Sequence, residues 1–187
     1  SLTINKGDFL AIVGTSGSGK STLLNQLGLL DTMTSGKISF CDTFISGLKS
    51  TKKSAFRLLY FGFIFQDYAL VPELTALENV KLPGLSLGLD NIVVERAAKS
   101  LLIRFGLQDH LYTRPPQLSG GQQQRVAIAR SLINNPAILF ADEPCANLDS
   151  TSSQIVMDYL AQVNRRGQTV VLVTHDPRVF PYADRLI

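Results

Sequence analysis

Cysteine is scarce in this chain, with only Cys41 and Cys145 among its 187 residues. The two form no C-x-x-C pair, and no histidine-rich segment surrounds either of them, which argues against a zinc site built on these thiols. So few cysteines are typical of proteins that work in a reducing cytosol. We therefore expect neither a disulfide framework nor a cysteine-bound metal.

Long apolar runs and dense basic tracts are also missing. No apolar run reaches the roughly 18 residues of a membrane span, so another polypeptide must cross the membrane if this protein works at one. The net charge is +3, and the only basic clusters are Lys49, Lys52 and Lys53, then Arg165 and Arg166. A nucleic-acid-binding arm needs a denser basic tract. We expect no nucleic-acid partner.

The rest of the composition is that of a globular domain, with 45% hydrophobic and 18% charged residues. A length of 187 residues predicts one domain with room for a subdomain. The sequence starts without Met, inside an alternation at Leu2 and Ile4 that is typical of a strand, and it stops as another apolar run begins. We expect residues 1–187 to form one domain that is truncated at both ends.

Four short apolar runs each end at a polar residue, namely FLAIVG before Thr15, FGFIF before Gln66, AILFA before Asp142 and TVVLVT before His175. Continuous apolarity is typical of strands covered on both faces, as in a parallel sheet flanked by helices. Ligands bind beyond the carboxyl ends of such strands, where these polar residues lie. The pattern predicts an α/β fold with a site along that edge.

Helical spacing of apolar residues recurs between these runs. Residues 150–166 carry one such stripe, with Asp149 or Ser150 as the N-cap, and a second stripe runs from Ala98 to Phe105. No run between about residues 72 and 135 is typical of a strand. We therefore expect residues 72–135 to form a helical subdomain inserted into the sheet.

The segment GTSGSGKST lies between an apolar run and a helical stretch. Its glycines allow the backbone N–H groups to curl around phosphates, and the following helix adds the positive end of its dipole. Lys20 can reach the β- and γ-phosphates, and Ser21 can bind Mg²⁺. The predicted nucleotide-binding residues of this segment are Gly14, Thr15, Ser16, Gly17, Ser18, Gly19, Lys20, Ser21 and Thr22.

Polar residues after the other three runs complete the expected site. Asp142 can hold the Mg²⁺ shell at the end of a buried strand, while the side chain of Glu143 diverges from it and can address an attacking water. Gln66 can contact the metal or the water and still move away, and His175 can contact a γ-phosphate. We predict Glu143, His175 and Gln66 as catalytic residues, and Ser21, Gln66 and Asp142 as metal ligands.

A second anion site is indicated by LSGGQ. Ser119 is an N-cap type residue, and Gly120 and Gly121 expose backbone N–H groups at the start of the helical run QQQRVAIARSL. Within one chain this loop would duplicate the glycine-rich loop at Gly14.

The ordered set of phosphate loop, glutamine, LSGGQ, Asp-Glu and histidine resembles the ATP-binding cassette (ABC) ATPases over essentially the whole chain. The resemblance implies a P-loop NTPase fold of the α/β class, with a mostly parallel core sheet, a small antiparallel β portion and an inserted helical subdomain. It also implies hydrolysis of ATP with Mg²⁺.

In that family two cassettes dimerise head to tail, and the signature of each completes the site of the other. The resemblance therefore implies a homodimer whose partner γ-phosphate is held by Ser119, Gly120, Gly121 and Gln122. It places Asp149 in the D-loop, as a further nucleotide-site residue.

The segment DYALVPELTALENVKLP and the extended signature resemble the macrolide-export, lipoprotein-release and antimicrobial-peptide subunits of the family. This likeness implies an ATPase at the cytoplasmic face of the membrane, attached through transmembrane permease subunits, that powers export or extraction of an amphipathic substrate. Cys145 stands where that family usually has Thr or Ser, which makes it a candidate thiol-sensitive position.

Two alternatives remain open at this point. A cell-division type of cassette would signal through a membrane partner without moving a substrate, and the sequence does not distinguish it. A DNA-repair or chromosome ATPase is disfavoured, because those proteins carry long inserts, whereas only about fifty residues separate Gln66 from Ser119.

Overall fold

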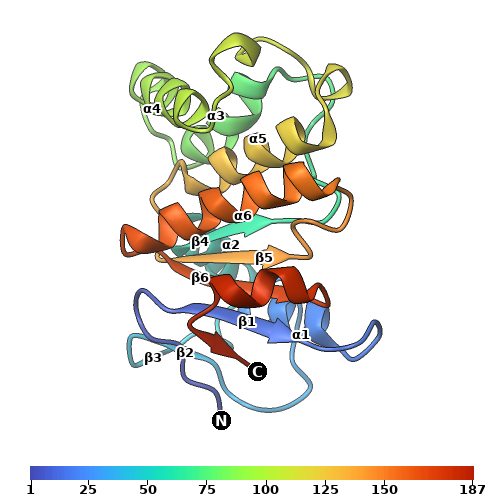
Figure 1. Ribbon diagram of the computed structural model, residues 1–187. Helices are drawn as coiled ribbons and strands as arrows, with labels where there is room; N and C mark the ends of the chain where they lie inside the picture. Colours follow the sequence, from blue (N-terminus) through green and yellow to red (C-terminus); the bar gives the residue numbers. More distant parts are fainter.

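A computed structural model describes residues 1–187, and its centre is a five-stranded parallel sheet with the order β4-β5-β6-β1-β7 (Figure 1). The strands are β1 (Phe9–Val13), β4 (Phe61–Ile64), β5 (Ile138–Asp142), β6 (Thr169–Thr174) and β7 (Arg185–Leu186). The four apolar runs therefore form parallel strands, which confirms the predicted α/β class and the mostly parallel core sheet.

Side chains alternate between two cores, one on each face of the sheet. On one face, Phe9, Leu139 and Val170 pack with residues of α5 (Gly120–Leu132) and α6 (Ser150–Arg165). On the other face, Leu10 and Phe140 pack with residues of α1 (Lys20–Leu27) and α2 (Ser50–Tyr60). Because neighbouring residues of a strand point to opposite faces, strands covered on both sides need the continuous apolar runs seen in the sequence.

The chain between β4 and β5 contains helices and no strand. It forms α3 (Ala76–Ser86), α4 (Asn91–Arg104), the 3₁₀ turns η1 (Gln108–His110) and η2 (Pro115–Gln117), and α5. Figure 1 shows α3 and α4 beyond the β4 edge of the sheet, far from β1. The first turn of α3 is closed by a capping box, in which Thr75 and Glu78 bond each other's backbone N–H groups.

A short antiparallel pair lies outside the main sheet, formed by β2 (Ser39–Phe40) and β3 (Thr43–Phe44). It confirms the expected small antiparallel β portion. The last 3₁₀ segment is η3 (Pro177–Tyr182). None of the helices combines the length and the apolar character needed to cross a membrane.

The strand expected around Leu2 and Ile4 does not form. The N–H of Asn5 donates instead to the carboxylate of Asp8 at 2.9 Å, and the N–H of Asp8 donates to the carbonyl of Asn5 at 3.1 Å. This local turn separates residues 1–4 from β1, which starts at Phe9.

Candidate nucleotide site

The glycine-rich loop runs from the end of β1 to the start of α1. Gly17 and Gly19 have φ angles of 79° and 91°, in the left-handed region that favours glycine. Gly19 is the N-cap of α1, so the helix begins directly at the loop and its free N–H groups face the same space. The Nζ of Lys20 donates to the carbonyl of Thr15 at 2.8 Å. The loop is therefore concave, and the bond from Lys20 to Thr15 spans it.

Ser21 and Asp142 meet although 121 positions separate them in the sequence. Ser21 Oγ donates to Asp142 Oδ1 at 2.8 Å. Burial at the end of β5 raises the pKa of Asp142, and the hydrogen bond from Ser21 opposes that shift. A hydroxyl and a carboxylate side by side are the hard oxygen ligands that Mg²⁺ prefers.

Glu143 follows β5 in a strained conformation with a φ of 44°, which costs on the order of 1–3 kcal/mol for a residue that is not glycine. Its N–H donates to Val173 O at 2.9 Å. Its carboxylate accepts from Thr174 Oγ1 at 3.0 Å, and His175 Nδ1 lies 2.7 Å from its other oxygen. The Glu143 side chain is 13% exposed and that of His175 is 62% exposed. The carboxylate is therefore held at two points next to solvent.

One cavity of about 340 Å³ brings half of the predicted site residues together, while Gly14, Thr15, Ser18 and Asp142 do not line it. Its lining includes Ser16, Gly17, Gly19, Lys20, Ser21 and Thr22 from the glycine-rich loop, with Gln66, Glu143 and His175 from three other strand ends. The cavity joins the phosphate loop to the residues predicted to act on an attacking water. Its shape and donors suit a phosphate chain.

The signature residues lie elsewhere on the molecule, at the start of α5. Ser119 is the N-cap and accepts from Gln122 N at 3.3 Å, while Gln122 Oε1 accepts from Ser119 N at 2.8 Å. A Cβ on Gly120 would lie 2.8 Å from Tyr68 Oη, so only glycine fits there without a shift. None of these residues lines the cavity. The predicted second anion site at the start of α5 therefore lies apart from the cavity of the same chain.

Asp149 also lies outside the cavity lining. Its carboxylate caps α6 by accepting from Ser152 N at 2.9 Å and from Ser152 Oγ at 2.7 Å. The backbone N–H of Ser152 holds the pKa of Asp149 below its ordinary value. In this chain Asp149 thus orients the start of α6.

Several contacts of the site were not predicted from the sequence. Thr174, the last residue of β6, bonds Glu143, and Asn147 Nδ2 donates to Gln66 O at 3.0 Å. Outside the cavity, Arg130 of α5 donates to Tyr68 O at 2.9 Å and to Ala69 O, in the segment that follows Gln66. Of these residues, only Thr174 could have been suspected from the sequence, because it directly precedes His175. The other residues are separated from their partners by more than 60 positions.

Comparison with known proteins gives a consistent result. A family model described as "ABC transporter" matches residues 1–146. The macrolide export ATP-binding/permease protein of Pasteurella multocida is 49% identical over 186 residues, which cover all of this chain and 29% of that protein. An uncharacterized ABC transporter ATP-binding protein of Methanocaldococcus jannaschii is also 49% identical, and there the match covers 83% of the relative.

Solved structures agree with the sequence comparison. A dimeric post-hydrolysis state of the ATP-binding cassette MJ0796, bound to ADP and Pi, is similar with a TM-score of 0.91 and 42% identity. The similarity covers all of this chain and 82% of that one. A second dimeric structure, described as a bacterial ABC transporter cassette, gives the same values.

Proposed function

The chain belongs to the ABC transporter family of ATPases, and from this premise we propose that it powers an exporter by hydrolysing ATP at the cytoplasmic face of a membrane. The observation that carries the proposal is the single cavity in which the phosphate loop meets the Glu143–His175 pair. Asp142 lies beside that cavity, bonded to its lining residue Ser21. The chain spans only 29% of the Pasteurella exporter, so transport itself is part of the proposal.

Phosphate binding falls to the glycine-rich loop in this proposal. Its backbone N–H groups and the N-terminus of α1 neutralise the phosphates, and Lys20 leaves Thr15 O to contact the β- and γ-phosphates. Ser21 and Asp142 would hold Mg²⁺, with Gln66 next to it, and the ion would neutralise charge on the same oxygens. This fits the oxygen pair at 2.8 Å.

Hydrolysis falls to Glu143. Its carboxylate is fixed by Thr174 and His175, so one of its oxygens can accept the proton of a water that attacks the γ-phosphate in line. His175 lines the cavity, and its contact with Glu143 keeps that carboxylate in place while negative charge shifts during phosphoryl transfer. Positioning and electrostatics then supply the rate, as is general in phosphoryl transfer.

We place the second half of the reaction site on another copy of the chain. The N-terminus of α5 has backbone N–H groups that could bind an anion, but it does not line the cavity of its own chain. A head-to-tail dimer would bring Ser119, Gly120, Gly121 and Gln122 against the γ-phosphate of the partner. The similar cassette MJ0796 is a dimer in its solved structures, which supports this arrangement.

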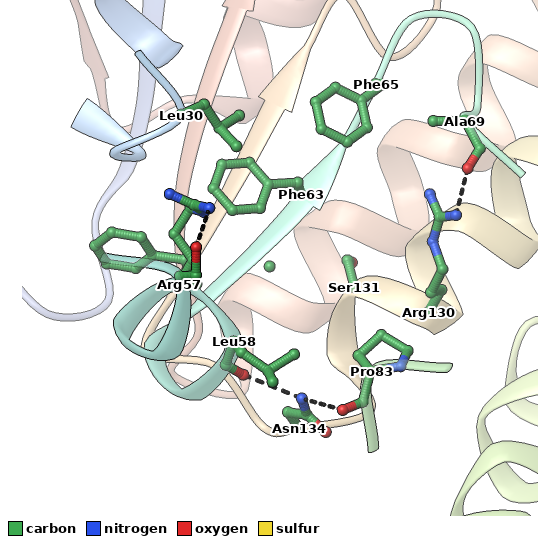
Figure 2. Close-up of a pocket in the computed structure, with 13 residues that line it drawn as sticks. Leu30, Arg57, Leu58, Phe63, Phe65, Ala69, Pro83, Arg130, Ser131 and Asn134 are labelled. Carbon is green, nitrogen blue, oxygen red and sulfur yellow. Dashed lines mark hydrogen bonds between the residues drawn. The ribbon is translucent and has the colours of Figure 1, made fainter. Parts of the chain in front are cut away.

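A second cavity suits the membrane partner. It has a volume of about 320 Å³ and lies between α2, β4, α3 and α5, with Phe63, Phe65 and Pro83 exposing apolar surface to it (Figure 2). Asn134 Nδ2 bridges Leu58 O at 3.0 Å and Pro83 O at 3.1 Å across its floor. We propose that a cytoplasmic helix of a permease docks here, next to Gln66. Relatives described as ATP-binding/permease proteins support such a partner.

The decisive experiment replaces Glu143 by Gln in the full protein. Because the phosphate loop is untouched, we expect Glu143→Gln to bind ATP as the unmodified protein does, to hydrolyse it at least about 100-fold more slowly, and to accumulate as an ATP-bound dimer. Equilibrium binding, phosphate release and sedimentation measure the three properties. Hydrolysis at the unmodified rate would refute the assignment of Glu143.

A further inference from the structure

The signature glutamine is held from two sides. Gln122 Oε1 accepts from Ser119 N at 2.8 Å, and Gln122 Nε2 lies 2.9 Å from His110 Nε2. Since the amide oxygen is committed to Ser119, the amide nitrogen faces the imidazole and donates to it. His110 Nε2 must then be the acceptor, so the neutral ring carries its proton on Nδ1. One hydrogen bond thus fixes both the tautomer of His110 and the orientation of Gln122.

The turn that carries His110 is itself anchored. The N–H of His110 donates to Leu107 O at 3.0 Å, and the N–H of Thr113 donates to His110 O at 3.1 Å. The next residues are tied to the start of α3, because Leu77 N donates to Leu111 O and Ala76 N donates to Thr113 O, both at 2.9 Å. These are N–H groups of the first turn of α3, which no bond within the helix satisfies. His110 therefore approaches Gln122 from a rigid support.

Without His110 the capping box of α5 would still close, because Ser119 and Gln122 bond each other. The Gln122 amide would then be held through its oxygen alone, since its nitrogen would have no protein partner. Rotation by half a turn would place two N–H donors against each other at Ser119 N. The imidazole removes this alternative and keeps the Ser119 loop in one conformation.

We propose that His110 is a positioning residue for the signature motif. Through Gln122 it keeps Ser119 and the first N–H groups of α5 aimed outward, at the γ-phosphate of the partner cassette. This inference rests on the proposed dimer. His110 does not line the nucleotide cavity of its own chain, so its effect appears in dimer formation and not in nucleotide binding by one chain.

Two variants of similar length separate this role from simple packing. His110→Gln keeps an acceptor oxygen at about the place of Nε2, whereas His110→Met fills similar space without a strong acceptor. Both are made in the Glu143→Gln protein, whose ATP-bound dimer does not turn over. The measurements are ATP binding at a protein concentration below that of dimerisation, and the ATP-dependent dimer dissociation constant by sedimentation.

We expect His110→Met to bind ATP as the parent does but to form a dimer about two- to tenfold weaker, as for one lost neutral hydrogen bond. His110→Gln should restore the dimer to within about twofold. In the parent, nitrogen NMR should show an unprotonated Nε2 and a protonated Nδ1 for His110. Equal dimer constants for the Met and Gln variants, or a proton on Nε2, would overturn the role of His110.

The outcomes also separate the two proposals. A parent protein that binds ATP but never dimerises would refute the proposed dimer and the role of His110 together. A parent that dimerises normally, with His110→Met equal to it, would refute the role of His110 alone and leave the proposed function intact.

Discussion

His175 Nδ1 lies 2.7 Å from Glu143 Oε1, although 32 positions separate the two residues. The contact follows from the sheet. Strands β5 and β6 are parallel neighbours with Asp142 opposite Val173, so the residues that follow the two strands emerge side by side. Glu143 has a left-handed backbone conformation, and its side chain bonds Thr174 at the end of β6. A histidine and a carboxylate that the sequence shows separately form one unit.

Replacing His175 by Ala should reduce ATP turnover by about 100-fold or more, because the carboxylate of Glu143 loses one of its two anchors and the cavity loses a polar wall. ATP binding should change little, since the phosphate loop is intact. Steady-state phosphate release and equilibrium nucleotide binding measure these effects. Thr174→Val is the matched control, because it removes the other anchor, together with the acceptor of the Asp176 N–H, and should reduce turnover less than about tenfold. Turnover near the unmodified value in His175→Ala would contradict this role.

Ser119→Arg should leave ATP binding by the single chain unchanged and reduce hydrolysis at least about tenfold, because a long side chain blocks the anion site at the start of α5. Loss of the N-cap alone costs about 1 kcal/mol, so a control must remove a cap elsewhere. Thr75→Ala does so at α3, where an equivalent capping box closes the first turn. Comparable hydrolysis by both variants, measured at equal folded fractions, would argue against a special role for Ser119. Gly120 is less suitable, because any side chain there meets Tyr68.

The thiol of Cys145 should resist alkylation. Burial raises its pKa to about 11, so the thiol stays protonated and poorly nucleophilic at any pH below that value. Cys41 is exposed and should react with iodoacetamide first. Mass spectrometry of the folded protein at pH 8 should show one modified cysteine with ATPase activity retained, and none in Cys41→Ser within the same time. Rapid labelling of Cys145 in the folded protein would restore it as a thiol-sensitive position.

Removal of divalent metal with EDTA should stop hydrolysis, and added Mg²⁺ should restore it. Ser21→Ala deletes one of the two oxygens that meet at 2.8 Å, so it should raise the Mg²⁺ concentration for half-maximal activity several-fold. Thr22→Ala, at the neighbouring position, leaves the Ser21–Asp142 pair intact and serves as the control. A metal dependence that is equal in both variants would remove Ser21 from the proposed metal site.

Asn134→Leu should destabilise the protein by about 1–3 kcal/mol, because the carbonyls of Leu58 and Pro83 each lose a hydrogen bond in a partly buried place. The free energy of unfolding in urea measures the loss. Gln108→Ala, at an exposed position whose side chain bonds only its neighbour Asp109, should change stability by less than about 0.5 kcal/mol. An unchanged unfolding free energy in Asn134→Leu would show that this bridge does not contribute.

The ends of the central strands were the most predictable part of the molecule. A strand buried on both faces has to be apolar throughout, so each polar residue that interrupts such a run marks the carboxyl edge of the sheet. That reasoning placed Asp142 and His175 correctly at strand ends and the glycine-rich loop at the end of β1, while Gln66 lies two residues beyond β4.

The contacts between side chains were harder to predict from the sequence, because they depend on strand order and on local backbone geometry. The sequence does not reveal that β6 lies between β1 and β5, nor that Glu143 has a positive φ. Helix α2 was also missed, since its first turns read Ser-Thr-Lys-Lys and none of its side chains is fully buried. The bond between His110 and Gln122 joins two elements whose distance in space no sequence pattern gives.

The order of the strands has a mechanical consequence. From β4 to β1 the edge of the sheet presents Gln66, then the acidic pair, then His175, then the phosphate loop. The helices α3 and α4 lie beyond the β4 edge of the sheet, at the Gln66 end of that row (Figure 1). A tilt of those helices would therefore reach the acidic pair of β5 before it reached the loop of β1. We therefore expect movement of these helices to change the position of the Glu143 carboxylate before it changes phosphate binding by the loop.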